Sequence, residues 1–208
     1  MRSKIFLCFA IFLTLFFLSG CTKIEKKKNM ENSTDKKAVI VIADEGFQDF
    51  EYSETRAVLE KAGIVVATAD LKGDQAISKS GDTIKVDKKI EDVEIKNFDA
   101  LVFIGGPGAL EYAENKNVHQ LVQQAISEGK ILGAICIAPE ILAKAGVLSG
   151  KKATVWTDEF DKTSIDVLRA DGAEYINQTV VADGKIITAN GPAASSEFGQ
   201  KIVELLNQ

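Results

Sequence analysis

The chain has 208 residues and a formal charge of −5 at pH 7, and this length is enough for one domain with a well-filled core. Its apolar residues are unevenly placed, since five of the eleven phenylalanines lie within residues 5–18. Six lysines lie within residues 22–37, so the part from Ala38 onward is more acidic than the chain as a whole. A domain this acidic has no basic face to neutralise phosphates, which argues against nucleic acid as a partner.

The first 20 residues have the pattern of a secretory signal peptide. Arg2 and Lys4 precede the apolar run at residues 5–18, which is shorter than the about 20 residues of a membrane span. The run ends in Leu-Ser-Gly before Cys21, so it resembles a bacterial lipoprotein signal. That resemblance implies that Cys21 carries lipid and holds an extracytoplasmic protein on a bacterial membrane. The alternative is an ordinary signal peptide that ends in a cysteine.

Residues 21–37 are expected to form a polar, lysine-rich tether between Cys21 and a single domain at residues 38–208. The tether is either wholly solvated or lies with its lysines against anionic lipid head groups. Cys8 would leave with the signal peptide, so Cys136 would be the only free thiol of the mature domain. No intrachain disulfide is therefore expected.

The domain alternates short apolar runs with segments of helical periodicity, beginning with the strand, helix, strand order of a βαβ unit at residues 38–69. Buried strands are expected at 38–43, 64–69, 100–104, 131–135 and 153–156, short polar elements at 83–86 and 91–95, and helices at 50–62, 118–126, 139–145, 165–170 and 194–206. Asp-Gly at 183–184 predicts a hairpin across residues 180–187. The expected fold is a flavodoxin-like α/β three-layer sandwich with a mostly parallel sheet, of the class I glutamine amidotransferase kind.

Cys136 lies where a buried strand runs directly into a helix, with Pro139 near the first helical position. This is the geometry of a nucleophile elbow. Backbone N–H groups and the positive end of the helix dipole would face the sulfur there, so we expect a thiol pKa below the ordinary value of about 8.5. The alternative is a small buried cysteine that fills space beside the sheet.

Four segments in this order and spacing resemble the DJ-1/PfpI (ThiJ/PfpI) superfamily, and together they cover nearly all of residues 38–206. They are residues 39–51, 98–108, 134–139 and 188–198. The resemblance implies a strained cysteine elbow at Cys136, frequent homodimers, and a glutamate from the first βα turn that hydrogen-bonds the thiol. That glutamate is Glu51, and the amides lining the site fall near Gly105, Gly106 and Ile137. Glu51 could instead be a solvated acid that merely favours its helix N-terminus.

The sequence also departs from parts of the family pattern. Ile137 stands where peptidase-like members have a histidine, Trp156 where other members bring one from the next strand, and Gln48 where some have a second acid. The only histidine, His119, is one residue off the apolar stripe of its helix and is expected to face solvent. A Cys-His dyad is therefore not expected, and Trp156 either walls the pocket or packs in the core.

A Cys136–Glu51 pair suits chemistry on small reactive carbonyl compounds, of the glyoxalase or deglycase kind, with a small molecule as substrate. The thiolate would add to an aldehyde and Glu51 would move a proton between adjacent carbons, with no cofactor. Residues 105–108 lack the spacing of a phosphate-binding loop, and no Cys/His cluster predicts a metal. The alternatives are a non-catalytic redox-sensing or ligand-binding module and, with less support, a cysteine peptidase or amidase.

Overall fold

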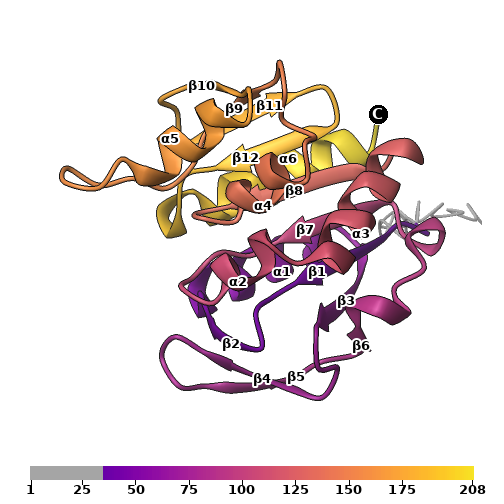
Figure 1. The fold of residues 1–208 in the computed structure, drawn as a ribbon. Helices are drawn as coiled ribbons and strands as arrows, with labels where there is room; N and C mark the ends of the chain where they lie inside the picture. Colours follow the sequence, from indigo (N-terminus) through magenta and orange to yellow (C-terminus); the bar gives the residue numbers. More distant parts are fainter. Residues whose placement is uncertain (1–34) are drawn as a thin grey trace, which may run out of the picture. The chain divides into compact units, whose positions relative to one another are not determined.

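The computed structural model describes residues 35–208, so the predicted signal peptide, Cys21 and most of the tether lie outside the described residues. A seven-stranded sheet forms the centre of the domain (Figure 1), with strand order β11-β12-β8-β7-β1-β3-β6. Its strands are β1 (Lys37–Val41), β3 (Val65–Asp70), β6 (Lys88–Lys89), β7 (Ala100–Phe103), β8 (Ile131–Ile135), β11 (Val180–Asp183) and β12 (Ile186–Ala189). All neighbours pair in parallel except β11 and β12, which form the predicted hairpin.

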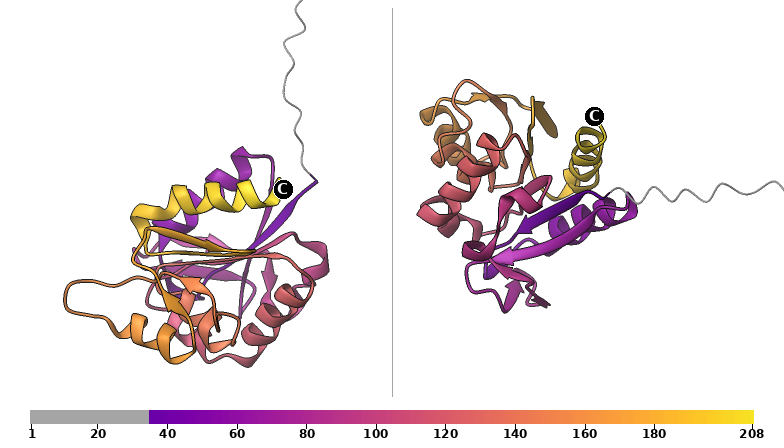
Figure 2. Two further views of the ribbon diagram at one scale, coloured as in Figure 1. Left: turned by 90° about the horizontal axis from the view of Figure 1, so that it is seen from above. Right: turned by 90° about the vertical axis from the view of Figure 1, so that its right-hand side faces the viewer.

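Helices cover both faces of this sheet, as Figure 2 shows. On one face α1 (Asp49–Lys61) packs against α6 (Ser195–Leu206). The other helices are α2 (Ala109–Ala113), α3 (Lys116–Ser127), α4 (Pro139–Lys144) and α5 (Thr163–Ala170), with 3-10 turns η1 (Ile90–Asp92), η2 (Ile95–Asn97) and η3 (Pro192–Ala194). The predicted three-layer α/β sandwich with a mainly parallel sheet is confirmed.

The central strands are apolar along their whole length because helices cover them on both faces. Every residue of β7 and of β8 is buried, as are the four residues that follow Lys37 in β1. Parallel strands covered on both faces lose the alternation of apolar and polar residues that marks a half-exposed strand. This burial accounts for the continuous apolar runs in the sequence.

Several short elements differ from the sequence-based expectation. A three-stranded sheet contains β2 (Glu45–Phe47), β4 (Gln75–Ser78) and β5 (Thr83–Lys85), of which only the last had a predicted counterpart. The strand expected at 153–156 is only β9 (Lys152–Ala153), paired with β10 (Glu174–Tyr175). These strands have few buried residues, so no apolar run marks them in the sequence.

The sheet order places a ligand site at a predictable edge. The chain runs from β1 to β3 on one side and later returns to β7 on the other side of β1. In open parallel sheets, ligands bind outside the carboxyl ends of the strands where the order reverses in this way. The loops after β1, β7 and β8 therefore meet at that edge. No helix among residues 35–208 is both long and apolar enough to cross a membrane.

Candidate active site

Cys136 follows β8 directly and is held in a left-handed backbone conformation. Its φ is 63°, and within residues 35–208 it is the one non-glycine residue with positive φ. That region costs an L-residue about 1–2 kcal/mol, so the surrounding structure must enforce it. The Cys136 amide donates to the carbonyl of Ala189 at 2.9 Å, and its carbonyl accepts from the Trp156 amide at 2.8 Å. Both sides of the strained residue are thus fixed, which confirms the predicted elbow.

Two backbone amides face the sulfur of Cys136 and act to lower its pKa. They belong to Gly106, in the loop after β7, and to Ile137, the next residue of the elbow. Gly106 has φ 104°, and a Cβ at this position would lie 2.4 Å from the carbonyl oxygen of Gly46. Only a glycine therefore allows the loop after β7 to pack this closely and to direct its amide at the thiol.

Glu51 reaches the thiol from the first turn of α1. Gln48 precedes the helix. Its side-chain oxygen accepts from the Phe50 backbone amide at 3.4 Å, and its backbone amide donates to the carbonyl of Gly105 at 2.9 Å. These bonds set the start of α1 against the loop after β7. The Glu51 side chain consequently points inward, is completely buried, and lies close enough to Cys136 for its charge to act on the thiol.

Gly105 separates the two side chains without filling the space between them. The Gly105 amide donates to Oε2 of Glu51 at 3.1 Å. Contrary to the expectation from the family resemblance, this amide is therefore not free to line an oxyanion site. A Cβ at this position would lie 2.5 Å from Cβ of Cys136 and 3.0 Å from Oε2 of Glu51. The glycine therefore lets the acid and the thiol meet. The second carboxyl oxygen, Oε1, is buried and has no hydrogen-bond partner among residues 35–208.

Burial dominates the acid-base properties of the pair. Desolvation is the largest influence on Glu51 and raises its pKa from 4.5 to about 7, against the opposing influence of Cys136 and the hydrogen bond from the Gly105 amide. Desolvation, followed by the negative charge of Glu51, raises the pKa of the Cys136 thiol to about 12. The prediction that the elbow lowers the thiol pKa is therefore wrong, because two amides do not offset burial beside a carboxylate.

The two groups titrate as one coupled system. Their pKa values of about 7 and about 12 mean that a single proton is held by the pair over the intervening range. Over that range the proton lies mainly on the sulfur, because the thiol has the higher pKa, and the ionised Glu51 beside it is placed to accept it. A thiol of this kind becomes a nucleophile by passing its proton to Glu51 rather than to water.

A pocket of about 410 Å³ opens above the sulfur at the carboxyl edge of the sheet. Its lining comprises Gln48, Lys79, Gly106, Pro107, Leu110, Cys136, Ile137, Trp156 and Pro192. Trp156 thus lies in the pocket wall, which is the first of the two alternatives considered for it; the other was packing in the core. Lys79 was missed by the sequence analysis, because it lies between β4 and β5 in a segment without apolar periodicity.

Comparison with known proteins identifies the family. The DJ-1/PfpI family profile matches residues 36–205. This chain belongs to the DJ-1/PfpI family. It is similar to the glutathione-independent glyoxalase DJR-1.2 of Caenorhabditis elegans, with 29% identity over 84% of this chain and 90% of that protein. It is also similar to the deglycase PfpI of Pyrococcus furiosus, with 30% identity over 81% of this chain and 98% of that protein.

Solved structures agree with this assignment. The ThiJ/PfpI domain protein of Brachyspira murdochii has a TM-score of 0.78 and 28% identity, and the match covers 82% of this chain and 96% of that one. The match covers nearly all of that protein and extends over most of the residues that the present structure describes. The DJ-1/PfpI domain therefore accounts for the whole sandwich around the Cys136 pocket.

His119 is not part of this DJ-1/PfpI site. It lies on α3 and is half-buried, with its Nε2 atom 2.6 Å from the carbonyl oxygen of Ala113. The side chain is thus only partly exposed to solvent, because the end of α2 contacts its ring. It does not line the pocket, and residues 35–208 contain no cluster of three or more His, Cys, Asp or Glu side chains able to hold a metal.

Proposed function

We propose that this protein is a cysteine-dependent enzyme that acts on small reactive carbonyl compounds. The observation that carries the proposal is the Cys136–Glu51 pair, in which a half-buried thiol lies beside a completely buried acid at an open pocket. The pKa of Glu51, about 7, suits a group that both accepts and donates a proton at neutral pH. Relatives named as a glyoxalase and as a deglycase support the same class of chemistry.

The geometry suggests a route from methylglyoxal to lactate. Cys136 passes its proton to Glu51 and adds through sulfur to the aldehyde carbon, giving a hemithioacetal. The amides of Gly106 and Ile137, which face the sulfur, stabilise the developing oxyanion. Glu51 gives the thiol proton to that oxyanion, takes the proton from the former aldehyde carbon and returns it to the neighbouring carbon, while the hydroxyl proton moves to the second oxygen to leave a thioester. Hydrolysis of the resulting thioester consumes one water and regenerates the thiol, so the first carbon is oxidised and the second reduced.

Methylglyoxal turnover tests this function directly. Purified protein should form lactate, and both Cys136→Ala and Glu51→Gln should abolish lactate formation. Glu54→Gln is the matched control, since it makes the same change one turn further along α1, outside the pocket. Lactate formation that survives in Cys136→Ala would show that the thiol is not the nucleophile.

We also propose that Cys21 is a lipid attachment site and that the protein works outside the cytoplasm on a bacterial membrane. The support is the basic start, apolar run and Leu-Ser-Gly-Cys end of residues 1–21, followed by a polar tether. Cells fed radiolabelled fatty acid should label the wild-type protein but not Cys21→Ala. Equal labelling of both, or an unlabelled wild type, would exclude the anchor.

A homodimer is proposed from the family resemblance. Sedimentation equilibrium of the purified protein should give twice the mass of one chain. A single-chain mass at high protein concentration would exclude it.

The same site favours a second candidate function, a redox sensor. Two amides and a protonated Glu51 would surround a sulfinate on Cys136 with hydrogen-bond donors. In that case peroxide should add two oxygen atoms to Cys136 readily, while methylglyoxal turnover is absent.

A further inference from the structure

Among residues 35–208, Lys79 is the one charged side chain that lines the Cys136 pocket, and the proposed mechanism does not use it. The other lining residues are neutral, and the domain as a whole is acidic. A single positive charge beside the reacting thiol is therefore a feature of this pocket rather than of the molecule as a whole. Its effect extends to Glu51, whose pKa it lowers through the attraction between unlike charges.

The backbone of Lys79 is fixed by the turn between β4 and β5. Its amide donates to the carbonyl of Phe47 at 2.8 Å, which joins the turn to the end of β2. On the preceding residue, the Ser78 amide donates to the carbonyl of Asp82 at 2.8 Å and the Ser78 hydroxyl accepts from the Asp82 amide at 3.0 Å. The lysine thus extends from an ordered turn at the pocket rim.

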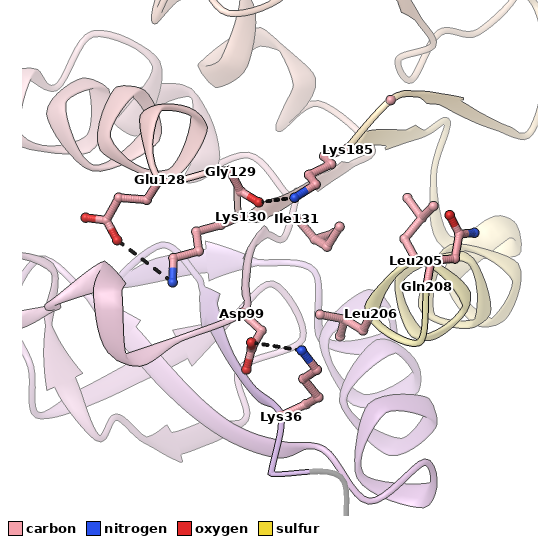
Figure 3. Close-up of a pocket in the computed structure, with 11 residues that line it drawn as sticks. Lys36, Asp99, Glu128, Gly129, Lys130, Ile131, Lys185, Leu205, Leu206 and Gln208 are labelled. Carbon is pink, nitrogen blue, oxygen red and sulfur yellow. Dashed lines mark hydrogen bonds and ion pairs between the residues drawn. The ribbon is translucent and has the colours of Figure 1, made fainter.

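The ammonium group of Lys79 has no carboxylate within 4.0 Å among the described residues, although the domain has many acids. A second cavity, of about 590 Å³, differs because two of its three lysines are paired with carboxylates and the third, Lys185, donates to the carbonyl of Gly129 (Figure 3). There Lys36 lies 3.3 Å from Asp99, and Lys130 lies 3.8 Å from Glu128. The Lys79 charge therefore remains available for a bound molecule.

We propose that Lys79 selects carbonyl substrates that carry a carboxylate at the end away from the reacting aldehyde. This inference rests on the proposed function for its substrate class. The carboxylate would lie at the pocket rim against the Lys79 ammonium group, while the aldehyde carbon reaches the sulfur of Cys136. Because the remaining lining is neutral, a loss of this one charge removes the preference.

Alkylation of Cys136 tests the charge preference without requiring turnover. Iodoacetate and iodoacetamide have nearly the same shape, but only iodoacetate carries a carboxylate. The rates at Cys136 in the full-length protein, read by mass spectrometry of the modified peptide, are expressed as the ratio of iodoacetate to iodoacetamide. The same ratio for the urea-unfolded chain corrects for the intrinsic reactivity of the two reagents.

We expect the corrected ratio to fall roughly fivefold in Lys79→Gln, the size of an exposed charge interaction, and to recover in Lys79→Arg. High salt should reduce the wild-type ratio in the same direction through screening. Lys85→Gln is the matched control, because it removes an exposed lysine from the same small sheet outside the pocket. Any change in the thiolate fraction of Cys136 affects both reagents equally and cancels in the ratio. An equal ratio in wild type and Lys79→Gln would overturn the proposal.

Enzymatic turnover tests the substrate preference itself. An α-oxoaldehyde ending in a carboxylate is compared with a methyl-ended analogue of the same length, and the ratio of their kcat/KM values should fall in Lys79→Gln but not in Lys85→Gln. Equal ratios in wild type and Lys79→Gln would contradict the substrate assignment. If neither compound is turned over by the wild type, the proposed function fails, while the alkylation ratio still decides whether Lys79 attracts anions to the pocket.

Discussion

Replacing Glu51 with glutamine should remove a pH-dependent loss of stability. Burial raises the Glu51 pKa from 4.5 to about 7, so the native state binds more protons than the unfolded chain over this interval. The free energy of unfolding therefore decreases as pH rises from 4.5 through 7. At 1.36 kcal/mol for each unit, the loss amounts to about 3 kcal/mol. Glutamine does not ionise, so Glu51→Gln should lack this decrease.

Urea unfolding of both proteins at a series of pH values measures the effect. The stability of Glu51→Gln relative to wild type should rise by about 3 kcal/mol across the interval from pH 4.5 to about pH 7, whatever constant offset the amide introduces. Glu54→Gln, on the same helix, should keep the wild-type dependence. A difference between Glu51→Gln and wild type that is independent of pH would refute the reasoning that burial raises this pKa.

Two further predictions concern the backbone of the site. Gly105→Ala should lower the free energy of unfolding by about 1–3 kcal/mol and disrupt thiol reactivity, because the new Cβ would lie 2.5 Å from Cβ of Cys136. In Gly133→Ala the new Cβ would lie 2.9 Å from the Phe198 ring, so this variant should lower stability without altering the alkylation rate of Cys136. If both glycine variants changed that rate equally, the special role of Gly105 beside the thiol would be contradicted. In urea titrations, the free energy of unfolding of Cys136→Gly should be about 1 kcal/mol higher than that of Cys136→Ala, since glycine relieves the strain at φ 63°. Equal free energies of unfolding would argue against strain at this position.

The fold was predictable where burial leaves a pattern in the sequence. The runs that became β1, β7 and β8 are apolar throughout because both faces of the sheet are covered. The small sheet containing β2, β4 and β5 was largely missed, because its strands have only three or four residues each and few of these are buried. Lys79 was missed with it, although the Ser-Gly-Asp that follows within residues 80–82 is a turn signal.

The candidate site was predictable in its members but not in its electrostatics. Cys136 and Glu51 meet as the family resemblance implies, with the Gly106 and Ile137 amides directed at the sulfur. The sign of the thiol pKa shift depends on the balance between those amides and desolvation, and burial of a particular side chain cannot be read from the motif. The role of Gly105 was likewise decided by three-dimensional packing, since its amide is taken by Glu51.

The central claim is that Cys136 and Glu51 share one proton, and the pH dependence of Cys136 alkylation tests it most directly. In wild type the rate of reaction with iodoacetamide should inflect near pH 7, where the pair loses its first proton. In Glu51→Gln no carboxyl group accepts the thiol proton, so the inflection should move upward, yet stay below about 12 because the Glu51 charge is gone. Identical profiles in both proteins, with one inflection near the ordinary thiol value of about 8.5, would contradict the shared proton.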